Sequence, residues 1–543
     1  MTSPTRALRQ VEDRWLLVVV TLLWGCILVG YTVLTPVWRS PDEVNHFDLV
    51  LDVSGGRGYA AWDDDELSVG VIEASSPVRD RPPRVPFAGD LPPLPVVSDD
   101  DAMSELANHM TQHPPAYYEL MGAELSVMRA VGLAPESLSG QLALVRVLSA
   151  LFLVPLPALG WLLARRLGAS PGVSRIALLL PLAVPGLAQV GSGVTNDAPL
   201  PLLFACVGLA LASMQRAASP RRAAAVTGVL CGLALFTKAF GAAALLWALL
   251  VVAAGLRRRG GRETIVTSAI LGGSAFLTGG WWYGRNLVLD GRVLPSLEEG
   301  RFDAPSSFAS AHRDLGDWAS RFWPTAGRGF FGLFGYAEVA VSDLAYRIAL
   351  VVALAGVVAG AVAVWRRGRT ALVLLVAPLP ILLVLQVSQS YRLFEQSGLV
   401  ALAHGRYLLP AFVPCAVLVS FAFTLPRRPL SRGLGLVVVA LGVLLHAHVL
   451  TRLVDFFWSD DGTSEALRTA VEWSPLMRPV SVAALGSVVP LLGVLIVLVV
   501  WLPGDRGPAG GGRPRTPPRA PSTGSPTPSG PPASSSPRPD LAG

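Results

Sequence analysis

Lysine is almost absent from this sequence. Among its 543 residues, 44 are lysine or arginine, and Lys238 is the one lysine. A P-loop needs Gly-Lys followed by Ser or Thr, whereas Ala239 follows Lys238, so P-loop ATPases and GTPases are excluded. No Gly-x-Gly-x-x-Gly motif opens a strand-to-helix unit either, which excludes the common dinucleotide-binding folds. We therefore expect neither a nucleotide nor a nucleic acid as a partner.

Charge and cysteine are also scarce. Charged residues make up 15% of the chain, whereas soluble domains carry about 25%, and 52% of the residues are hydrophobic. Many apolar stretches reach the length of about 20 residues that a membrane helix needs, which predicts an all-α polytopic membrane protein. The cysteines all lie inside apolar runs, so neither a disulfide framework nor a thiolate metal site is expected. They are Cys26, Cys206, Cys231 and Cys415.

The arginines fall in short clusters between the apolar runs, where they indicate topology. Cytoplasmic flanks of membrane helices are rich in basic residues, so residues 1–14, with three arginines, are placed in the cytoplasm. The first run, Trp15–Val37, is too long for a signal-peptide core and predicts an uncleaved first helix. Further runs lie near 142–164, 173–190, 197–215, 223–256, 264–283, 346–365, 370–388, 405–424, 433–452 and 480–502.

The run 223–256 has arginine clusters at both ends, so both ends should face the cytoplasm and the chain should turn near Lys238. When every arginine cluster is assigned to the cytoplasmic side, the apolar runs between the clusters predict about 12 membrane helices with both termini cytoplasmic. The membrane domain then covers 15–503, followed by a Pro-, Ser- and Gly-rich tail expected to be disordered. The tail is 504–543, and the two large extracytoplasmic loops are 38–141 and 284–345.

The first outer loop opens with two carboxylates, Asp42 and Glu43. Ser40 can cap a helix here, and Glu43 three residues later completes a capping box, which is a purely local role. The alternative is catalysis, because Asp42 and His46 share one helix face where the first helix leaves the membrane. A helix N-terminus keeps a carboxylate ionised, as a general base requires. Spacing alone leaves both interpretations open.

The same loop ends with two histidines, two prolines and two tyrosines. The prolines should start a new helix that carries Tyr117 and Tyr118, for which an aromatic belt at the membrane interface is the local alternative. His109 and His113 could contribute to a zinc site, but two histidines are half of one.

Several polar residues are predicted to lie on the outer side. Three of them are cations, which could contact head groups separately or hold one phosphate together. An Asn-Asp pair in a short outer turn could cap a helix, or it could belong to the same site as the three cations. The set is Asn196, Asp197, Lys238, Arg285, Asn286 and Arg406.

In their order along the chain, these motifs resemble the bacterial domain-of-unknown-function family 2142. They are Pro-Asp-Glu-x-x-His, His-Pro-Pro-x-Tyr-Tyr, Thr-Asn-Asp, a lysine in a short hairpin, Trp-Trp-Tyr-x-Arg-Asn and Gly-Arg-Tyr-x-x-Pro, over about residues 14–450. That family is similar to the GT-C glycosyltransferases, which use polyprenyl-phosphate-linked sugars and carry an acidic motif in the first outer loop. Asp42-Glu43 occupies that place. The Pro-rich stretch 75–100 is not part of the pattern, and its role is unassigned.

The resemblance and the topology together predict a membrane glycosyltransferase with a GT-C-like fold in a bacterial plasma membrane. Nucleotide sugars are cytoplasmic, so an activated sugar outside should arrive on a lipid phosphate and pass to a cell-envelope glycan or lipid. Asp42 would deprotonate the acceptor, with Glu43 orienting it or joining Asp42 in binding a divalent metal. Cations would stabilise the leaving phosphate, and other residues would bind the sugar. The cations are Lys238, Arg285 and Arg406. The residues expected to bind the sugar are His46, His113, Tyr117, Asn196, Asp197 and Asn286.

Two other functions fit the same cations. A transporter or flippase of lipid-linked saccharides would also grip phosphate, but such proteins often contain inverted repeats, and no repeat is apparent. The other alternative is that the protein is a structural component of a cell-envelope assembly. The enzyme alone requires base, sugar and phosphate to meet, so it predicts that the scattered residues converge on one outer cavity that opens toward lipid.

Overall fold

The computed structural model divides the chain into two units, 1–504 and 505–543, and every described residue lies in the first. The expected tail, the run 480–502 and most of the Pro-rich stretch fall outside the described residues. Those described are 4–60, 65–81, 102–217, 219–256, 260–295, 314–425, 428–458 and 462–476.

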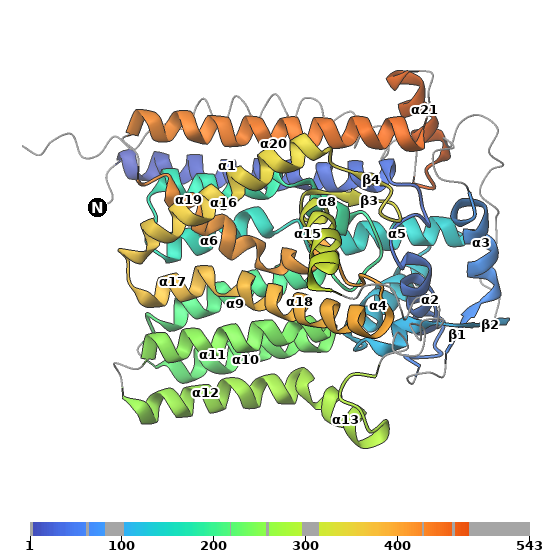
Figure 1. Ribbon diagram of the computed structural model, residues 1–543, viewed down its shortest axis with the longest axis horizontal. Coiled ribbons are helices and arrows are strands. Elements are labelled where there is room, and N and C mark those ends of the chain that lie inside the picture. Colours follow the sequence, from blue (N-terminus) through green and yellow to red (C-terminus); the bar gives the residue numbers. More distant parts are fainter. Residues whose placement is uncertain are drawn as a thin grey trace, which may run out of the picture. The chain divides into compact units, whose positions relative to one another are not determined.

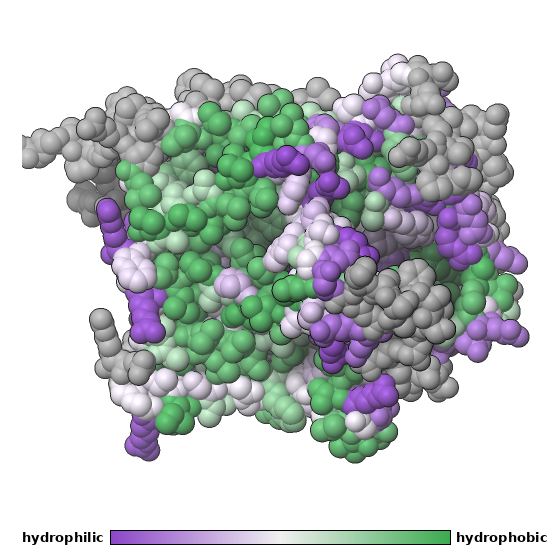
Figure 2. All heavy atoms as spheres, viewed as in Figure 1, coloured by the Kyte–Doolittle hydropathy of each residue, from purple (hydrophilic) through white to green (hydrophobic). Residues whose placement is uncertain are grey.

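Long apolar helices form a bundle in which α1 and α20 run side by side (Figure 1). Side chains of α16 such as Val351 and Val358 are 66% and 64% exposed, although they are apolar. Figure 2 shows hydrophobic side chains gathered over the middle of this face and hydrophilic ones toward its ends, as expected of a surface that meets lipid. The chain is a membrane protein by this pattern. These elements are α1 (Pro4–Leu34), α16 (Asp343–Trp365), α19 (Phe412–Ala422) and α20 (Arg428–Phe457).

The predicted count of about 12 membrane helices is not confirmed. Within the described ranges, five helical stretches are long and apolar enough to cross a membrane, or up to seven if each of two bent pairs is one span. The five are Arg14–Leu34, Ala239–Leu256, Asp343–Trp365, Gly405–Ala422 and Gly433–Phe457.

Prolines explain part of the difference, because proline removes a helical hydrogen bond and clashes with the preceding turn. The run 142–164 divides just before Pro155, and the run 173–190 bends by 61° before Pro185. The pieces are α5 (Leu138–Ala150), α6 (Leu156–Arg166), α7 (Pro171–Leu179), η2 (Leu180–Ala183), α8 (Pro185–Gly191), α17 (Arg369–Val376) and α18 (Pro378–Ser397).

The predicted turn at Lys238 is confirmed. α10 ends at Thr237, Lys238 has an extended backbone, and η3 leads into α11. One apolar run is therefore a helical hairpin, as arginine clusters at both of its ends required. The neighbouring elements are α9 (Pro199–Met214), α10 (Pro220–Thr237), η3 (Ala239–Gly241), α11 (Ala242–Leu256), α12 (Gly261–Ala275), the π-helical η5 (Phe276–Gly280) and α13 (Trp281–Leu289).

Arginine-bearing turns from separate parts of the chain meet at one end of the bundle. Arg221 before α10's apolar part pairs with Glu263 of α12, with 2.9 Å between Nη2 and Oε2. Arg367, at the turn from α16 to α17, donates to the carbonyl oxygens of Leu167 and Gly168 after α6. The described part of residues 38–141, which is predicted to be the first outer loop and keeps that name below, lies at the opposite end in Figure 1. The arrangement agrees with arginine clusters that share one side of the membrane.

The first outer loop folds into helices and a short ribbon beside the bundle. β1 and β2 pair antiparallel, with Glu66 opposite Ala107, and α2 packs closely on α4. Gly122 permits this contact, since a Cβ there would lie 2.5 Å from the side chain of Val53. The elements are α2 (Glu43–Ser54), β1 (Glu66–Ser68), α3 (Val69–Arg79), β2 (Met103–Ala107), η1 (His109–Gln112) and α4 (Ala116–Ala130).

The second outer segment contributes a helix that the sequence did not predict. α15 packs on η6 so closely that a Cβ on Gly405 would lie 1.9 Å from the backbone nitrogen of Phe330. This contact fixes the position of Arg406, the next residue. The described part of the chain is thus helical with two short ribbons rather than entirely α. The remaining elements are α15 (Leu315–Phe331), β3 (Leu333–Phe334), β4 (Val339–Ala340), η6 (Gly405–Ala411) and α21 (Thr463–Trp473).

Candidate functional site

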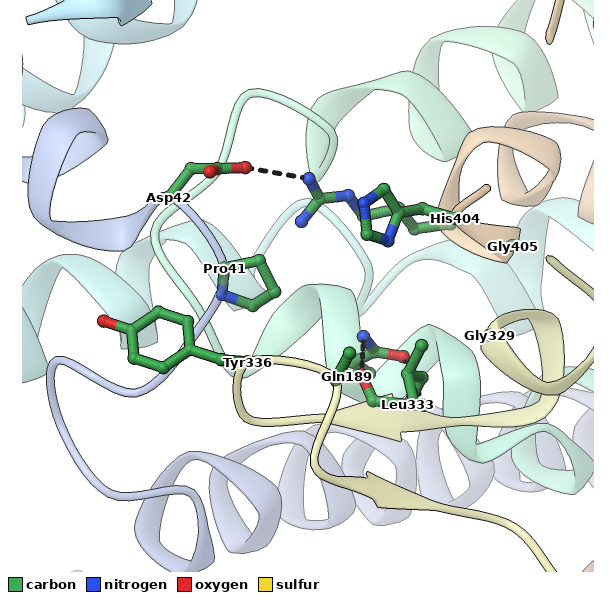
Figure 3. Close-up of a pocket in the computed structure, with 10 residues that line it drawn as sticks. Pro41, Asp42, Gln189, Gly329, Leu333, Tyr336, His404 and Gly405 are labelled. Carbon is green, nitrogen blue, oxygen red and sulfur yellow. Dashed lines mark hydrogen bonds and ion pairs between the residues drawn. The ribbon is translucent and has the colours of Figure 1, made fainter. Parts of the chain in front are cut away.

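Asp42 is held in an unusual backbone conformation between α1 and α2. Its φ is 60° and its ψ is 8°, in the left-handed region, which disfavours most side chains by about 1–2 kcal/mol. It stands at the N-cap of α2, yet its side chain makes no capping hydrogen bond. Ser40, the N-cap in the capping-box interpretation, lies outside the helix, although its backbone nitrogen donates to Oε2 of Glu43 at 3.4 Å, as that interpretation expected. The carboxylate of Asp42 instead points to Arg406, whose Nη2 donates to its Oδ2 at 3.1 Å (Figure 3). A strained residue whose side chain faces away from its own helix is a candidate for function.

Glu43 points elsewhere and has a different partner. It is fully buried and paired with Arg146, which is also fully buried, through Nε–Oε1 and Nη2–Oε2 contacts of 2.7 and 2.6 Å. Arg146 also donates to the carbonyl oxygens of Thr35 and Pro36 at the end of α1. The backbone nitrogen of Val194 donates to Oε1 of Glu43 as well.

The geometry therefore corrects the role expected for Glu43. Both of its carboxylate oxygens are engaged, so it is poorly placed to orient an acceptor or to share a metal ion with Asp42. It ties the strained turn at Asp42 to the turn that carries Asp197. Charged Arg146 inside the apolar run 142–164 was the sequence signal for this pair, because an ionisable residue in such a run needs a partner.

Removing one partner of this pair should be strongly destabilising. We expect Arg146→Met to lower the free energy of unfolding by about 3–5 kcal/mol, because Glu43 would remain buried without its counter-ion. Asp317→Asn is a matched control, since Asp317 and Arg321 form an exposed i,i+4 pair worth about 0.3–0.5 kcal/mol. Denaturant or thermal unfolding in detergent measures both. Equal, small losses in the two variants would contradict a supporting role for the buried pair.

Four charged side chains form a continuous chain from the outer loop into the bundle. Arg406 contacts Asp42 and also approaches Asp197, with 3.2 Å between its Nε and Oδ2. Lys238 donates to Oδ1 of Asp197 at 2.6 Å. The two cations also lie over the ring of Tyr407, at 4.9 Å for Lys238 and 5.4 Å for Arg406. Part of the expected cluster thus forms around Asp197, and it contains two carboxylates and two cations.

Aromatic and imidazole rings stack beside this charged chain. His46 is buried, its Nδ1 lies 2.8 Å from the hydroxyl of Tyr118, and its ring stacks on those of Tyr118 and His113. Burial lowers the pKa of His46 to about 3, so the ring is neutral at physiological pH. Asn196 donates to the Tyr118 hydroxyl at 3.4 Å. Tyr118 is therefore not part of an aromatic belt. Tyr117 is buried too, with its hydroxyl 2.9 Å from that of Ser149.

Arg285 and Asn286 stay outside the charged chain. Arg285 lies over the ring of Trp282 at 4.7 Å and donates to the side chain of Asn286 at 3.3 Å. Among the described residues, Trp282 contacts the ring of Tyr59, which in turn contacts Tyr118. The expected clamp of three cations is therefore reduced to Lys238 and Arg406.

Asp42 lines two cavities, one bordered also by Arg406 and the other by His109; they are called the inner and the outer cavity here. The inner cavity, of about 210 Å³, also has Arg406 and His404 in its wall. Gln189 closes one side of it by hydrogen bonds in both directions with the backbone of Leu333 in β3 (Figure 3). The outer cavity, of about 560 Å³, is formed by the first outer loop. Its wall includes Asn45, Leu67, Arg79, Leu106 and His109, and Tyr336 lines both cavities.

A long apolar groove of about 1460 Å³ runs beside the inner cavity. α15 and η6 separate the two, because Gly329 and Gly405 face the cavity while Phe330 and Leu408 line the groove. The other groove residues come mainly from α16, α19 and α20. Sequence reasoning missed Tyr336, His404 and the α15 wall. Glycines and an aromatic stripe at helical spacing were the available signals for α15.

Three acids in the first outer loop form a separate cluster. One oxygen of each of Asp48, Asp52 and Asp65 lies within 4.8 Å of the others, as in a cation site. However, Asp48 accepts hydrogen bonds from Ser68 and Asn108, so the cluster also holds β1 and β2 on α2. Burial, together with the nearby acids, raises the pKa of Asp48 to about 6 and that of Asp65 to about 7.

These raised pKa values predict a pH-dependent loop. A carboxyl whose pKa is higher in the folded state stabilises the fold at low pH, and the stability is lost as pH rises through the folded value. We expect the contribution of this cluster to the melting temperature to fall between about pH 4 and pH 7, opposite in sign to the contribution of buried neutral histidines such as His46. Asp65→Asn should flatten that slope and add about 1 kcal/mol of stability at pH 8, after a discount for the partial exposure of Asp65. Unfolding curves in EDTA test this, and a slope unchanged in the variant would contradict it.

A protein-family model matches part of the chain. Residues 107–289 are similar to the dolichyl-phosphate-mannose-protein mannosyltransferase family. This region contains Asp197, Lys238 and Arg285 but neither Asp42 nor Arg406, and it is less than half of the chain. No curated protein matches the sequence.

Solved structures give distant likenesses. ArnT from Cupriavidus metallidurans bound to undecaprenyl phosphate is 15% identical, with a TM-score of 0.44 over 90% of this chain and 78% of that one. ArnT in the apo state gives 0.46 at the same identity and coverage. AglB from Archaeoglobus fulgidus, in complex with an inhibitory peptide and a dolichol-phosphate, is 13% identical, with a TM-score of 0.41 over 89% of this chain and 56% of that one.

Proposed function

We propose that the protein is a membrane glycosyltransferase that moves a sugar from a polyprenyl-phosphate-linked donor to a hydroxyl of a cell-envelope acceptor on the extracytoplasmic side. The observation that carries the proposal is the position of Asp42 between two cavities, one of which adjoins cations and an apolar groove. The partial match to a family named for a dolichyl-phosphate-linked sugar supports the same class of donor.

The inner cavity and the groove suit the two parts of such a donor. Arg406 is oriented toward the cavity and Lys238 lies behind it on Asp197, so a phosphate there would meet positive charge. The prenyl chain would lie in the groove, where each buried CH₂ contributes about 0.8 kcal/mol. The backbones of α15 and η6 are in direct contact at Gly329 and Gly405, so a donor that fills both spaces requires this contact to open.

The outer cavity suits the acceptor. It combines polar groups of Asn45, Arg79 and His109 with apolar patches from Leu67 and Leu106, a mixture that fits a sugar ring or a glycolipid head. Oδ1 of Asp42 faces the imidazole of His109 at 4.0 Å, while its Oδ2 faces Arg406. An acceptor hydroxyl in this cavity would therefore reach Asp42 from the side opposite the donor phosphate.

The reaction proceeds by one displacement. Asp42 takes the proton of the acceptor hydroxyl, and the acceptor oxygen attacks the anomeric carbon of the donor sugar. The bond from that carbon to the phosphate oxygen breaks, and its electron pair leaves with the polyprenyl phosphate. Arg406 and Lys238 stabilise the charge that develops there. A single displacement inverts the anomeric centre.

The proposal requires the site to face the outside of the cell, and cysteine labelling tests this. In a background without the four native cysteines, Glu73→Cys in α3 should react with an impermeant maleimide in intact cells. Ser219→Cys, exposed in the arginine-bearing turn before α10, should react only after lysis. The reverse pattern would place Asp42 in the cytoplasm and remove the reason for a lipid-linked donor.

A further inference from the structure

The two ion pairs of Arg406 differ in their environment. Its partner Asp197 has a side chain that is only 4% exposed and is bound to Lys238 as well. Its other partner, Asp42, has a side chain that is 40% exposed and borders both cavities. One contact is therefore buried within the bundle, and the other is open to a ligand that enters the inner cavity (Figure 3).

The charges of this cluster balance before any ligand arrives. Asp42 and Asp197 carry two negative charges, and Arg406 and Lys238 carry two positive ones. A phosphodiester adds one more negative charge, and a phosphate monoester adds about 1.5–2 at pH 7. An uncompensated charge in a largely buried site is strongly unfavourable, so a carboxylate must move away from a cation. Asp197 is held by both cations, which leaves Asp42 as the group that yields.

We propose that the Asp42–Arg406 ion pair is a resting contact that the donor phosphate displaces, so that donor binding frees Asp42 to act as the base. The inference rests on the proposed function and concerns the regulation of the same site. Burial alone would raise the pKa of Asp42, but the charge of Arg406 holds it well below its usual value. Asp42 is a weak base while Arg406 contacts it, and it becomes a stronger one when phosphate takes over Arg406. The acceptor is then deprotonated only when a donor is present.

Binding of undecaprenyl phosphate to the full chain in nanodiscs tests the competition. Asp42→Asn should bind about tenfold more tightly than the wild type, because the competing carboxylate is gone. Arg406→Gln should bind at least tenfold more weakly. The double variant should be as weak as Arg406→Gln alone, because Asp42 acts only by occupying Arg406. Asparagine tolerates the left-handed conformation of residue 42, so Asp42→Asn should fold normally.

Two further ligands and one control identify the source of the effect. Undecaprenol, which lacks the phosphate, should bind the wild type and Asp42→Asn equally. Inorganic phosphate should bind far more weakly than the lipid, and equal affinity would identify free phosphate as the ligand and contradict the proposed donor. Asp317→Asn, which removes an exposed carboxylate of α15 that contacts Arg321, should leave all three affinities unchanged.

The results separate the inference from the function. An Asp42→Asn affinity equal to that of the wild type would overturn the inference. A gain that persists in the Arg406→Gln background would also overturn it, because the effect would then be general charge repulsion. A wild-type protein with no measurable affinity for undecaprenyl phosphate would contradict the proposed function itself.

Discussion

Asp42→Asn is expected to lower the rate of sugar transfer by about 10²–10⁴, the contribution typical of one positioned base. The variant keeps the shape of the side chain and suits the left-handed backbone, so its melting temperature should remain close to that of the wild type. The loss should appear in kcat rather than in KM for the donor. Initial rates with a lipid-linked sugar donor, beside unfolding curves of the same preparations, provide the measurement.

Two controls give that comparison its meaning. Asp317→Asn removes an exposed carboxylate of α15 that contacts only its own helix in the described part of the chain, and it should transfer sugar at the wild-type rate. Asp42→Ala should lose activity and also some stability, because alanine is less tolerant of a φ of 60°. Full turnover by Asp42→Asn would rule out this carboxylate as the base.

Arg406→Gln should lower kcat by about 10²–10³, the usual effect of losing one group that stabilises a developing anion. Arg285→Gln should change kcat little, because Arg285 lies over Trp282 and no contact joins it to Asp42 or Asp197 in the described residues. The pair of variants distinguishes the observed cluster from the clamp of three cations that the sequence predicted. Steady-state rates with a saturating donor measure it.

For the Arg406 variants too, a loss of rate has to be distinguished from a loss of folded protein. Arg406→Gln leaves Asp42 and Asp197 with one cation fewer, so some loss of stability is expected. Arg406→Lys keeps the positive charge but cannot offer two nitrogens to the two carboxylates, so it should fold better and still lose about tenfold in rate. A large loss in Arg285→Gln together with a small one in Arg406→Lys would contradict the assignment.

Local sequence patterns predicted the parts of the fold that depend on local chemistry. Arginine clusters at both ends of 223–256 required a hairpin, and the structure turns at Lys238. Prolines marked the start of α4, and the acidic motif after the first apolar run marked the start of α2. The order of motifs brought Asp42, Asp197, Lys238 and Arg406 into one hypothesis, and the structure places them in one chain of contacts.

The remainder depended on packing between distant segments. An apolar run shows that a segment avoids water, but it does not show that proline and neighbouring helices will break it, as at Pro155 and Pro185. Glu43 looked equivalent to Asp42 in sequence, and only the position of Arg146, about 100 residues later, separates their roles. The wall between cavity and groove depends on Gly329 and Gly405 meeting across the fold, a contact that no local pattern contains.

The central claim is that sugar leaves a polyprenyl phosphate at a site controlled by Asp42. The most direct measurement uses purified protein in nanodiscs with undecaprenyl-phosphate-linked sugars and an envelope extract from cells that lack the protein. Mass spectrometry then follows the donor, the released undecaprenyl phosphate and the glycosylated acceptor. The account predicts equal amounts of the two products with the wild type and essentially none with Asp42→Asn. A donor that stays intact with the wild type, or that crosses a sealed vesicle unchanged, would contradict transfer, and intact crossing would indicate a transporter instead.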